Sequence, residues 1–230
     1  MAIFSVQYGI AWGEVGDSMG LDSEIVYIVD DDPIVREALS SLLRSNGKNV
    51  RLFTSGTEFL SFKQDDTAAC LVLDLKMPGM GGLEVQRAIS AQTSVPIVFI
   101  TGRGDIPSTV KAMKGGALDF LTKPVDETVL LAAIEQALQK DRSARVDASE
   151  QADLLARFRS LTPREQEVLP LLVRGLLNKQ AAAELGISEY TVQIHRGNIM
   201  RKMKADSFAM LVKLATKLRP EQSGAPGGKN

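Results

Sequence analysis

The sequence predicts two domains, a doubly wound α/β domain with a five-stranded parallel sheet and an all-α domain of four helices, joined by a helical linker. Five short apolar runs alternate with five helical patterns over residues 24–140, which is typical of a parallel sheet covered on both faces. Over residues 157–220, four helix-start signals follow one another without a strand pattern between them. We therefore expect residues 24–140 and 157–220 to be the two domains.

The α/β domain begins with EIVYIVDDD, an apolar run that ends in acids and is predicted to be a buried strand. Pro33 suits the first turn of the next helix, and Asn46-Gly47 suits its end. VRLF is the second expected strand, and helical spacing follows over Ser55–Phe62. The third strand, CLVLDL, is partly β-branched and stops at a Pro-Gly loop.

The second half of the domain repeats the alternation. The expected elements are a helix over Gly82–Ala91, the strand VPIVFITG, a helix over Pro107–Gly115, the strand LDFLTKP and a long helix over Val125–Lys140. Residues 141–156 are the expected linker; they lack Gly and Pro and contain good helix formers. We expect this linker to be helical and to extend the preceding helix.

A start signal marks each of the four helices of the all-α domain, and a glycine marks the end of the first two. The expected helices are Pro163–Val173 after the cap Thr162 and before Gly175, Asn178–Leu185 before Gly186, Glu189–Met203 after the cap Ser188, and one after the cap Ser207 to Leu218. A helix, a Gly-containing turn and a second helix form the helix-turn-helix outline. Residues 221–230 are expected to be a flexible tail.

Composition and charge support two modules with different tasks. Residues 1–149 hold 14 Lys+Arg and 20 Asp+Glu, a net charge of −6, whereas residues 150–230 hold 13 and 8, a net charge of +5. Such asymmetry indicates a C-terminal module that meets a polyanion. The single cysteine, Cys70, lies in an apolar strand, so it is predicted to be a core residue in a reducing compartment such as the cytoplasm.

No apolar run approaches the roughly 18 residues of a membrane-spanning helix. Residues 1–23 lack the basic start of a signal peptide, and we expect them to be a weakly ordered extension.

Polar side chains end four of the five expected strands. These residues are Asp30, Asp31, Asp32, Asp74, Thr101 and Lys123. Because the carboxyl ends of parallel strands share one edge of a sheet, we expect these side chains to converge there. Carboxylates with a hydroxyl and an ammonium group suit Mg²⁺ together with phosphate oxygens. A buried carboxylate is costly without such partners, so Asp74 is predicted to be a nucleophile that forms an acyl phosphate.

The stretches VDDDP, LDLKMPGMGG, ITG and FLTKP, in this order, resemble the receiver domain of bacterial two-component response regulators. The resemblance implies a flavodoxin-like fold in which Asp30 and Asp31 bind Mg²⁺ and Asp74 is the phosphoacceptor. It also implies that the backbone carbonyl of Lys76 is a further metal ligand. Asp32 falls outside the acidic pair, and we interpret it as the N-cap of the helix at Pro33 rather than as a ligand.

The same resemblance assigns roles to residues of the fourth and fifth strands. It implies that Thr101 engages the phosphoryl group and moves toward it, and that Lys123 binds phosphate. A cis peptide bond is expected before Pro124. Phe120 corresponds to the switch aromatic that swings inward when the threonine moves.

The stretch from Leu161 to Met203, LTPREQEVLPLLVRGLLNKQAAAELGISEYTVQIHRGNIMRKM, resembles the LuxR/NarL-type output domain, and the whole chain is similar to FixJ-like regulators. In its third helix, the spacing of Val192, Ile199 and Met203 predicts a buried stripe. Glu189, Gln193, Arg196, Gly197 and Arg201 are expected on the side left for solvent or DNA.

The resemblance places this third helix in the major groove, with Gln193, Ile194 and Gly197 facing bases. Gln193 is suited to pair with adenine, and Ile194 to touch a thymine methyl group. The predicted phosphate contacts are Lys179, Thr191, Arg201, Lys202 and Lys204. Gly197 fits either a close approach of the backbone to DNA or simple tolerance of glycine, and both interpretations stay open.

The resemblance implies a DNA-binding transcriptional regulator that is controlled by phosphorylation and is not an enzyme. The single histidine, His195, is interpreted as a structural residue or phosphate contact rather than a catalyst, so a separate sensor histidine kinase is needed as phosphoryl donor. The other expected partners are double-stranded promoter DNA, a second copy of the phosphorylated chain and RNA polymerase.

Two alternatives belong to other classes of protein. The first is an aspartyl phosphohydrolase of the haloacid dehalogenase type, which Lys76 disfavours because it stands where that chemistry places a second acid. The second is a DNA-binding or RNA-binding scaffold that is never phosphorylated.

Overall fold

The computed structural model describes residues 24–90, 95–102 and 106–218. The expected N-terminal extension and the C-terminal tail lie outside these residues. The described residues divide into two compact units, the first ending at Arg142 and the second beginning at Ser143. No helix among these described ranges is long and apolar enough to cross a membrane.

The first unit is built on a five-stranded sheet in which every neighbouring pair is parallel, as predicted. The strands are β1 (Ile25–Val29), β2 (Asn49–Phe53), β3 (Ala69–Asp74), β4 (Ile97–Thr101) and β5 (Asp119–Thr122), in the order β2-β1-β3-β4-β5. The order reverses between β1 and β3, so the chain leaves these two neighbouring strands in opposite directions across the sheet. Such a switch point opens a crevice at the carboxyl ends of the strands.

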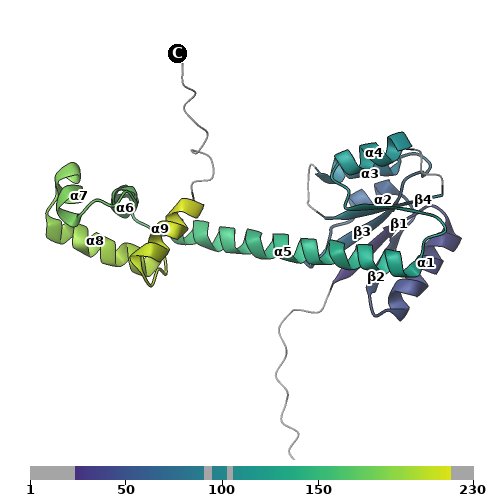
Figure 1. Cartoon of the computed structure of the whole chain (residues 1–230), viewed down its shortest axis with the longest axis horizontal. Helices are drawn as coiled ribbons and strands as arrows, with labels where there is room; N and C mark the ends of the chain where they lie inside the picture. Colours follow the sequence, from purple (N-terminus) through teal and green to yellow (C-terminus); the bar gives the residue numbers. More distant parts are fainter. Residues whose placement is uncertain (1–23, 91–94, 103–105, 219–230) are drawn as a thin grey trace, which may run out of the picture. The chain divides into compact units, whose positions relative to one another are not determined.

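Helices cover both faces of this sheet (Figure 1). The helices are α1 (Pro33–Ser45), α2 (Gly56–Ser61), α3 (Gly82–Ser90), α4 (Ile106–Lys114) and α5 (Glu127–Arg159). One core joins Leu39 and Leu43 of α1 and Ile134 of α5 to the side chains of one face. A second core joins α2, α3 and α4 to the other face, where Phe59 and Phe99 are fully buried. The predicted doubly wound fold is confirmed.

The single cysteine lies where the sequence predicts, in the core. Cys70 is fully buried in β3, and burial raises the pKa of its thiol. A thiol held neutral in this way is a packing group rather than a nucleophile.

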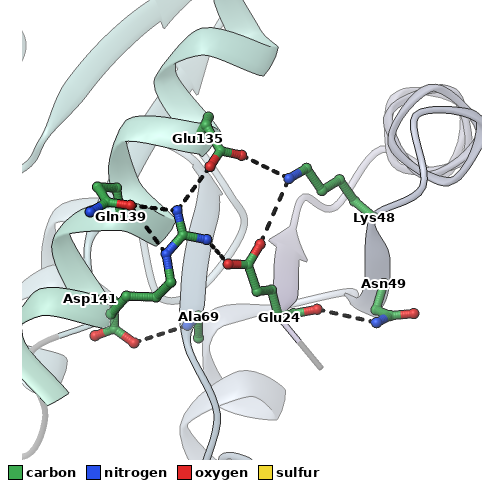
Figure 2. A network of polar contacts seen from close by, with 8 residues as sticks. Glu24, Lys48, Asn49, Ala69, Glu135, Gln139 and Asp141 are labelled. Atoms are coloured by element: carbon green, nitrogen blue, oxygen red, sulfur yellow. Dashed lines mark hydrogen bonds and ion pairs between the residues drawn. The ribbon is translucent and has the colours of Figure 1, made fainter. Parts of the chain in front are cut away.

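Helix α5 continues without interruption from Glu127 to Arg159, across the boundary between the two units. The expected helical linker is therefore part of α5, as the absence of Gly and Pro from residues 141–156 indicates. Within the first unit, a network of polar side chains and the backbone N–H of Ala69 holds α5 against the starts of the strands. We call its eight residues the basal network (Figure 2). They are Glu24, Lys48, Asn49, Ala69, Glu135, Gln139, Asp141 and Arg142.

One hydrogen bond of the basal network is buried. The carboxylate of Asp141 is 3% exposed and accepts a hydrogen bond of 2.9 Å from the backbone N–H of Ala69, the first residue of β3. Around it, the Arg142 guanidinium pairs with Glu24 and Glu135, and Lys48 donates to Glu135 at 2.8 Å. Asp141 and Arg142 thus belong structurally to the first unit, although the sequence places them in the linker.

The second unit contains α6 (Pro163–Val173), α7 (Asn178–Leu185), α8 (Glu189–Lys202) and α9 (Phe208–Lys217), close to the predicted bounds. Thr162 and Glu165 form a reciprocal capping box at α6, and the Ser188 and Ser207 side chains cap α8 and α9. Gly186 ends α7 in the left-handed conformation, which glycine adopts without steric cost. Leu154, near the end of α5, is buried in the same core as these helices.

Candidate functional site

The first candidate site lies at the switch point of the sheet. Asp30 directly follows β1, and Asp74 is the last residue of the neighbouring β3. Carboxylate oxygens of Asp30, Asp31 and Asp74 all lie within 4.8 Å of one another. Asp30 and Asp74 are buried, whereas Asp31 is exposed. The strand ends thus bring the adjacent carboxylates of Asp30 and Asp31 together with that of Asp74, 44 positions from Asp30, and the cluster meets solvent at Asp31.

Lys123 reaches the same cluster from the end of β5. Its Nζ donates to Asp30 Oδ2 at 2.7 Å and lies 3.0 Å from Asp74 Oδ1. The backbone fixes the start of this side chain, because the Lys123 N–H donates to the carbonyl of Thr101 at 2.7 Å. The peptide bond between Lys123 and Pro124 is cis, as expected.

Backbone groups orient the two buried carboxylates. Asp30 Oδ1 accepts a hydrogen bond of 2.9 Å from the N–H of Asp32, and Asp74 Oδ2 accepts one of 3.1 Å from the N–H of Lys76. The side chain of Asp32 accepts from the N–H of Ile34 at 2.8 Å and caps α1, which confirms its interpretation as a cap. Asp32 therefore points its carboxylate at the helix and not at the cluster.

The electrostatics of the cluster leave Asp74 short of positive charge. Burial raises the pKa of the Asp74 carboxyl, and the nearby Asp30 adds to the increase, although Lys123 opposes it. For Lys123, burial lowers the pKa, but the hydrogen bonds to Asp30 and Asp74 outweigh burial and raise it. A further cation near Asp74 would stabilise the charged form of its carboxylate, which Lys123 alone does not fully compensate.

The residues present fit a magnesium ion. Mg²⁺ prefers one or two carboxylates with water and phosphate oxygens in octahedral geometry. Three carboxylates and one ammonium group give this cluster a formal charge of −2, which one Mg²⁺ balances. The carbonyl of Lys76 stays a predicted ligand.

Thr101 and Phe120 lie on β4 and β5, which neighbour each other in the sheet. Thr101 ends β4 and is 1% exposed, and β4 pairs directly with β3, which carries Asp74. Phe120 lies in β5 opposite Phe99, with the ring centroids 6.3 Å apart, and is half-buried against the core. The expected movement of Thr101 and Phe120 stays a prediction, because it concerns a second state of the chain.

The second candidate site is the exposed side of α8. Val192, Ile199 and Met203 are fully buried, so the predicted inner stripe of this helix is confirmed. Of the residues predicted to face bases, Gln193, Ile194 and Gly197 are all exposed. Lys179 at the start of α7 and Arg201 and Lys204 at the end of α8 are exposed as well.

Three other residues that the sequence places on the DNA or solvent side of α8 have partners inside the domain. The Lys202 ammonium is bound at 2.6 Å to the buried carboxylate of Glu165. Arg196, expected on the solvent side, is half-buried with its guanidinium 4.7 Å from the centre of the Phe208 ring. The Thr191 hydroxyl lies 2.8 Å from that of the cap Ser188. A contact from any of these three to phosphate competes with an internal partner.

Sequence reasoning overlooked two residues of this domain. The sequence assigned no role to Glu165, which forms the capping box of α6 and also binds Lys202, 37 positions away. Tyr190 is 74% exposed at the start of α8 and was not among the predicted contacts. Its position four residues before Ile194 is the signal that places both on one side of a helix. His195 is half-buried on the flank of α8, and its Nδ1 has no hydrogen-bond partner among the described residues.

Comparisons with known proteins agree with this geometry. Residues 26–135 match the family model of the response regulator receiver domain, and residues 159–215 match that of bacterial regulatory proteins of the luxR family. The response regulator protein TmoT of Ectopseudomonas mendocina is 48% identical over 90% of this chain and 95% of its own length. The transcriptional regulatory protein FixJ of Rhizobium meliloti is 44% identical over 83% of this chain and 94% of its own.

A solved structure is similar over both units. The low-resolution structure of the response regulator StyR matches with a TM-score of 0.80 and 51% sequence identity, and the match covers 85% of this chain and 99% of that one.

Proposed function

Because the chain belongs to the bacterial response regulators that join a receiver domain to a LuxR-type DNA-binding domain, we propose that phosphorylation of Asp74 controls how it binds DNA. The chain is a two-component transcriptional regulator and not an enzyme. Its receiver domain implies a sensor kinase as partner, and its second domain implies DNA. The assignment of individual residues and the sequence of events are the parts that we propose.

The arrangement around Asp74 supports its role as phosphoacceptor. A carboxylate oxygen of Asp74 attacks the phosphorus of a phosphohistidine on the kinase, a P–O bond forms, and the P–N bond breaks as the imidazole of the kinase takes up a proton. Lys123, 3.0 Å from Asp74 Oδ1, is placed to pair with a phosphoryl oxygen. A phosphohistidine donor would have to belong to another protein, since the single histidine of this chain lies in α8 of the DNA-binding domain.

Asp30 and Asp31 would hold Mg²⁺ together with Asp74, and the carbonyl of Lys76 would be a further ligand. The ion, when bound, neutralises the negative charge that the phosphoryl group brings to a site already carrying three carboxylates. Thr101 hydrogen-bonds a phosphoryl oxygen, and Phe120 follows it inward. This rearrangement alters the face formed by α4 and β5, and the phosphorylated chain dimerises through it.

The dimer presents two copies of α8 to the half-sites of an imperfect palindrome. Gln193, Ile194 and Gly197 face bases, while Lys179 and Arg201 contact phosphates. RNA polymerase is the proposed recipient of the signal at the promoter. We place these events in the cytoplasm, where a kinase phosphohistidine and promoter DNA are both accessible.

Labelling with acetyl [³²P]phosphate tests the central step. The wild-type chain is expected to incorporate label in the presence of Mg²⁺, to lose it on treatment with hydroxylamine, and to remain unlabelled in EDTA. Asp74→Asn is expected to abolish labelling. The matched control is Asp32→Asn, because asparagine retains the cap of α1 and the residue stands outside the cluster. Labelling that persists in Asp74→Asn would assign the chemistry to another residue.

A further inference from the structure

The residues of α8 that lie opposite its buried stripe are not the same set as the DNA contacts that the sequence indicates. An α-helix turns by about 100° per residue, so Tyr190, Ile194 and Gly197 lie within about 40° of the direction opposite to the buried stripe. Arg201 completes this line toward the end of the helix. Gln193, by the same geometry, lies about 80° away from that direction, on a flank. We call Tyr190, Ile194, Gly197 and Arg201 the crest of α8.

The crest carries side chains that are unusual for a solvent-exposed helix surface. Tyr190 is 74% exposed and Ile194 is 47% exposed. Gly197 carries no side chain, and a Cβ built on it would have no atom within 4 Å. The line therefore begins with two projecting apolar side chains, continues with bare backbone and ends with a cation. A polar solvent-facing helix would place charged residues at these positions, because exposed apolar groups contribute nothing there.

We propose that Tyr190 is a sequence-determining DNA contact, and that Tyr190 and Ile194 together recognise two thymine methyl groups about two base steps apart. The inference rests on the proposed function of α8 as the helix that enters the major groove. Four residues of helix rise by about 6 Å. Two base steps along one strand span about 6.8 Å. The two apolar side chains are therefore spaced to meet two methyl groups, the one apolar group that base edges offer in the major groove.

Neighbouring residues allow this contact. The bare backbone at Gly197 adds no bulk next to Ile194, so the crest can enter the groove deeply enough for both apolar side chains to reach base edges. Arg201 at the far end is placed for a phosphate. The net charge of +5 over residues 150–230, from 13 basic and 8 acidic side chains, supplies the attraction that brings this surface to DNA.

The test begins with selection of binding sites from a random duplex library by the full-length, phosphorylated chain. The selected half-site is expected to contain two thymines separated by one base. Binding is then measured by fluorescence anisotropy on the selected duplex and on versions in which deoxyuridine replaces each thymine, which removes only the methyl group. For the wild-type chain each replacement is expected to weaken binding about fourfold, the effect of one methyl-sized group leaving a contact.

Tyr190→Ala is expected to weaken binding to the selected duplex about tenfold and to abolish the effect of one of the two deoxyuridine replacements. Tyr190→Phe is the matched control, since it keeps the ring, and should keep both the affinity and the methyl dependence. Equal weakening by Tyr190→Ala on selected and random duplexes would overturn the inference and make Tyr190 a backbone contact. Unchanged binding would overturn it as well.

A wild-type chain that binds no duplex with salt-dependent affinity would overturn the proposed DNA-binding role itself. This outcome differs from a chain that binds its selected site normally but does not depend on Tyr190.

Discussion

Asp74 carries a negative charge that the folded chain holds at a cost, so we expect Asp74→Asn to stabilise the receiver domain when Mg²⁺ is absent. Attraction to Lys123 at 3.0 Å is worth about 5.5 kcal/mol at an effective dielectric constant of about 20. Repulsion from Asp30 and from Asp31, with oxygens within 4.8 Å, costs about 3.5 kcal/mol for each at the same dielectric constant. The net electrostatic penalty is therefore about 1.5 kcal/mol.

Two further effects act on this penalty in opposite directions. Asp31 is exposed, so solvent screens its share of the repulsion, whereas the burial of Asp74 adds a desolvation cost. We expect Asp74→Asn to increase the free energy of unfolding by about 1–2 kcal/mol. Lys123 keeps its hydrogen bond to Asp30 in this variant, so its ammonium group is not left alone.

The pH dependence of this gain has a definite sign. Because the folded state raises the pKa of Asp74, the folded chain binds a proton there more readily than the unfolded chain does. Ionisation of Asp74 therefore lowers stability as the pH rises above the usual value of 3.8 for an aspartate. The advantage of Asp74→Asn should be absent below that value and complete above the raised pKa.

Native-state hydrogen exchange with mass spectrometry measures the effect, since peptides from β3 (Ala69–Asp74) report on the receiver domain separately from the DNA-binding domain. In EDTA at neutral pH, Asp74→Asn should slow the exchange of β3 about tenfold, the factor that corresponds to about 1.4 kcal/mol. Mg²⁺ should protect the wild-type chain more than the variant. Glu37→Gln, at an exposed position of α1, is the control for loss of one charge. Faster exchange in Asp74→Asn would refute the reasoning, because attraction to Lys123 would then outweigh repulsion.

The remaining predictions concern single contacts. Glu165 is 3% exposed and its partner Lys202 is 28% exposed, so Glu165→Gln should destabilise the DNA-binding domain by about 2 kcal/mol in urea unfolding at pH 7. Burial opposes ionisation of Glu165, but the hydrogen bond and charge of Lys202 outweigh burial and lower the pKa of its carboxyl. The stability that this ion pair adds is therefore fully present above pH 4.5 and should be lost as the pH falls through the lowered pKa. Gly197→Ala should stabilise the same domain by about 0.5–1 kcal/mol and yet weaken duplex binding measured by anisotropy, whereas unchanged binding would favour simple tolerance of glycine. Gly82→Ala should speed the exchange of β3, because a Cβ there would lie 2.4 Å from the carbonyl oxygen of Asp74 and 2.9 Å from the Phe99 ring; an unchanged rate would contradict the close packing of α3 on β3.

Much of the fold could be predicted because the relevant signals are local. Apolar runs and capping residues lie next to the elements that they define, and the ends of parallel strands meet at one edge whatever the details of packing. The cluster of Asp30, Asp74 and Lys123 follows from that rule alone.

Other features depend on contacts between residues far apart in sequence, which local patterns do not contain. The link between Glu165 and Lys202 joins α6 to α8 across 37 positions, and nothing in either helix signals it. The link between Asp141 and Ala69 spans 72 positions. Tyr190 was overlooked for another reason: its spacing from Ile194 puts both on one side of α8, but the exposure of its side chain is known only from the folded domain.

The basal network bears on how the receiver domain can be produced by itself. A fragment cut after Lys140, where the apolar pattern of the helix ends, would discard the carboxylate that receives the first amide of β3 and the guanidinium that ties Glu24 to Glu135. A buried amide without an acceptor costs about 1–3 kcal/mol. A fragment that extends two residues further, through Arg142, should therefore melt at a higher temperature than the shorter one, and a cloning boundary at Lys140 would make the domain look less stable than it is.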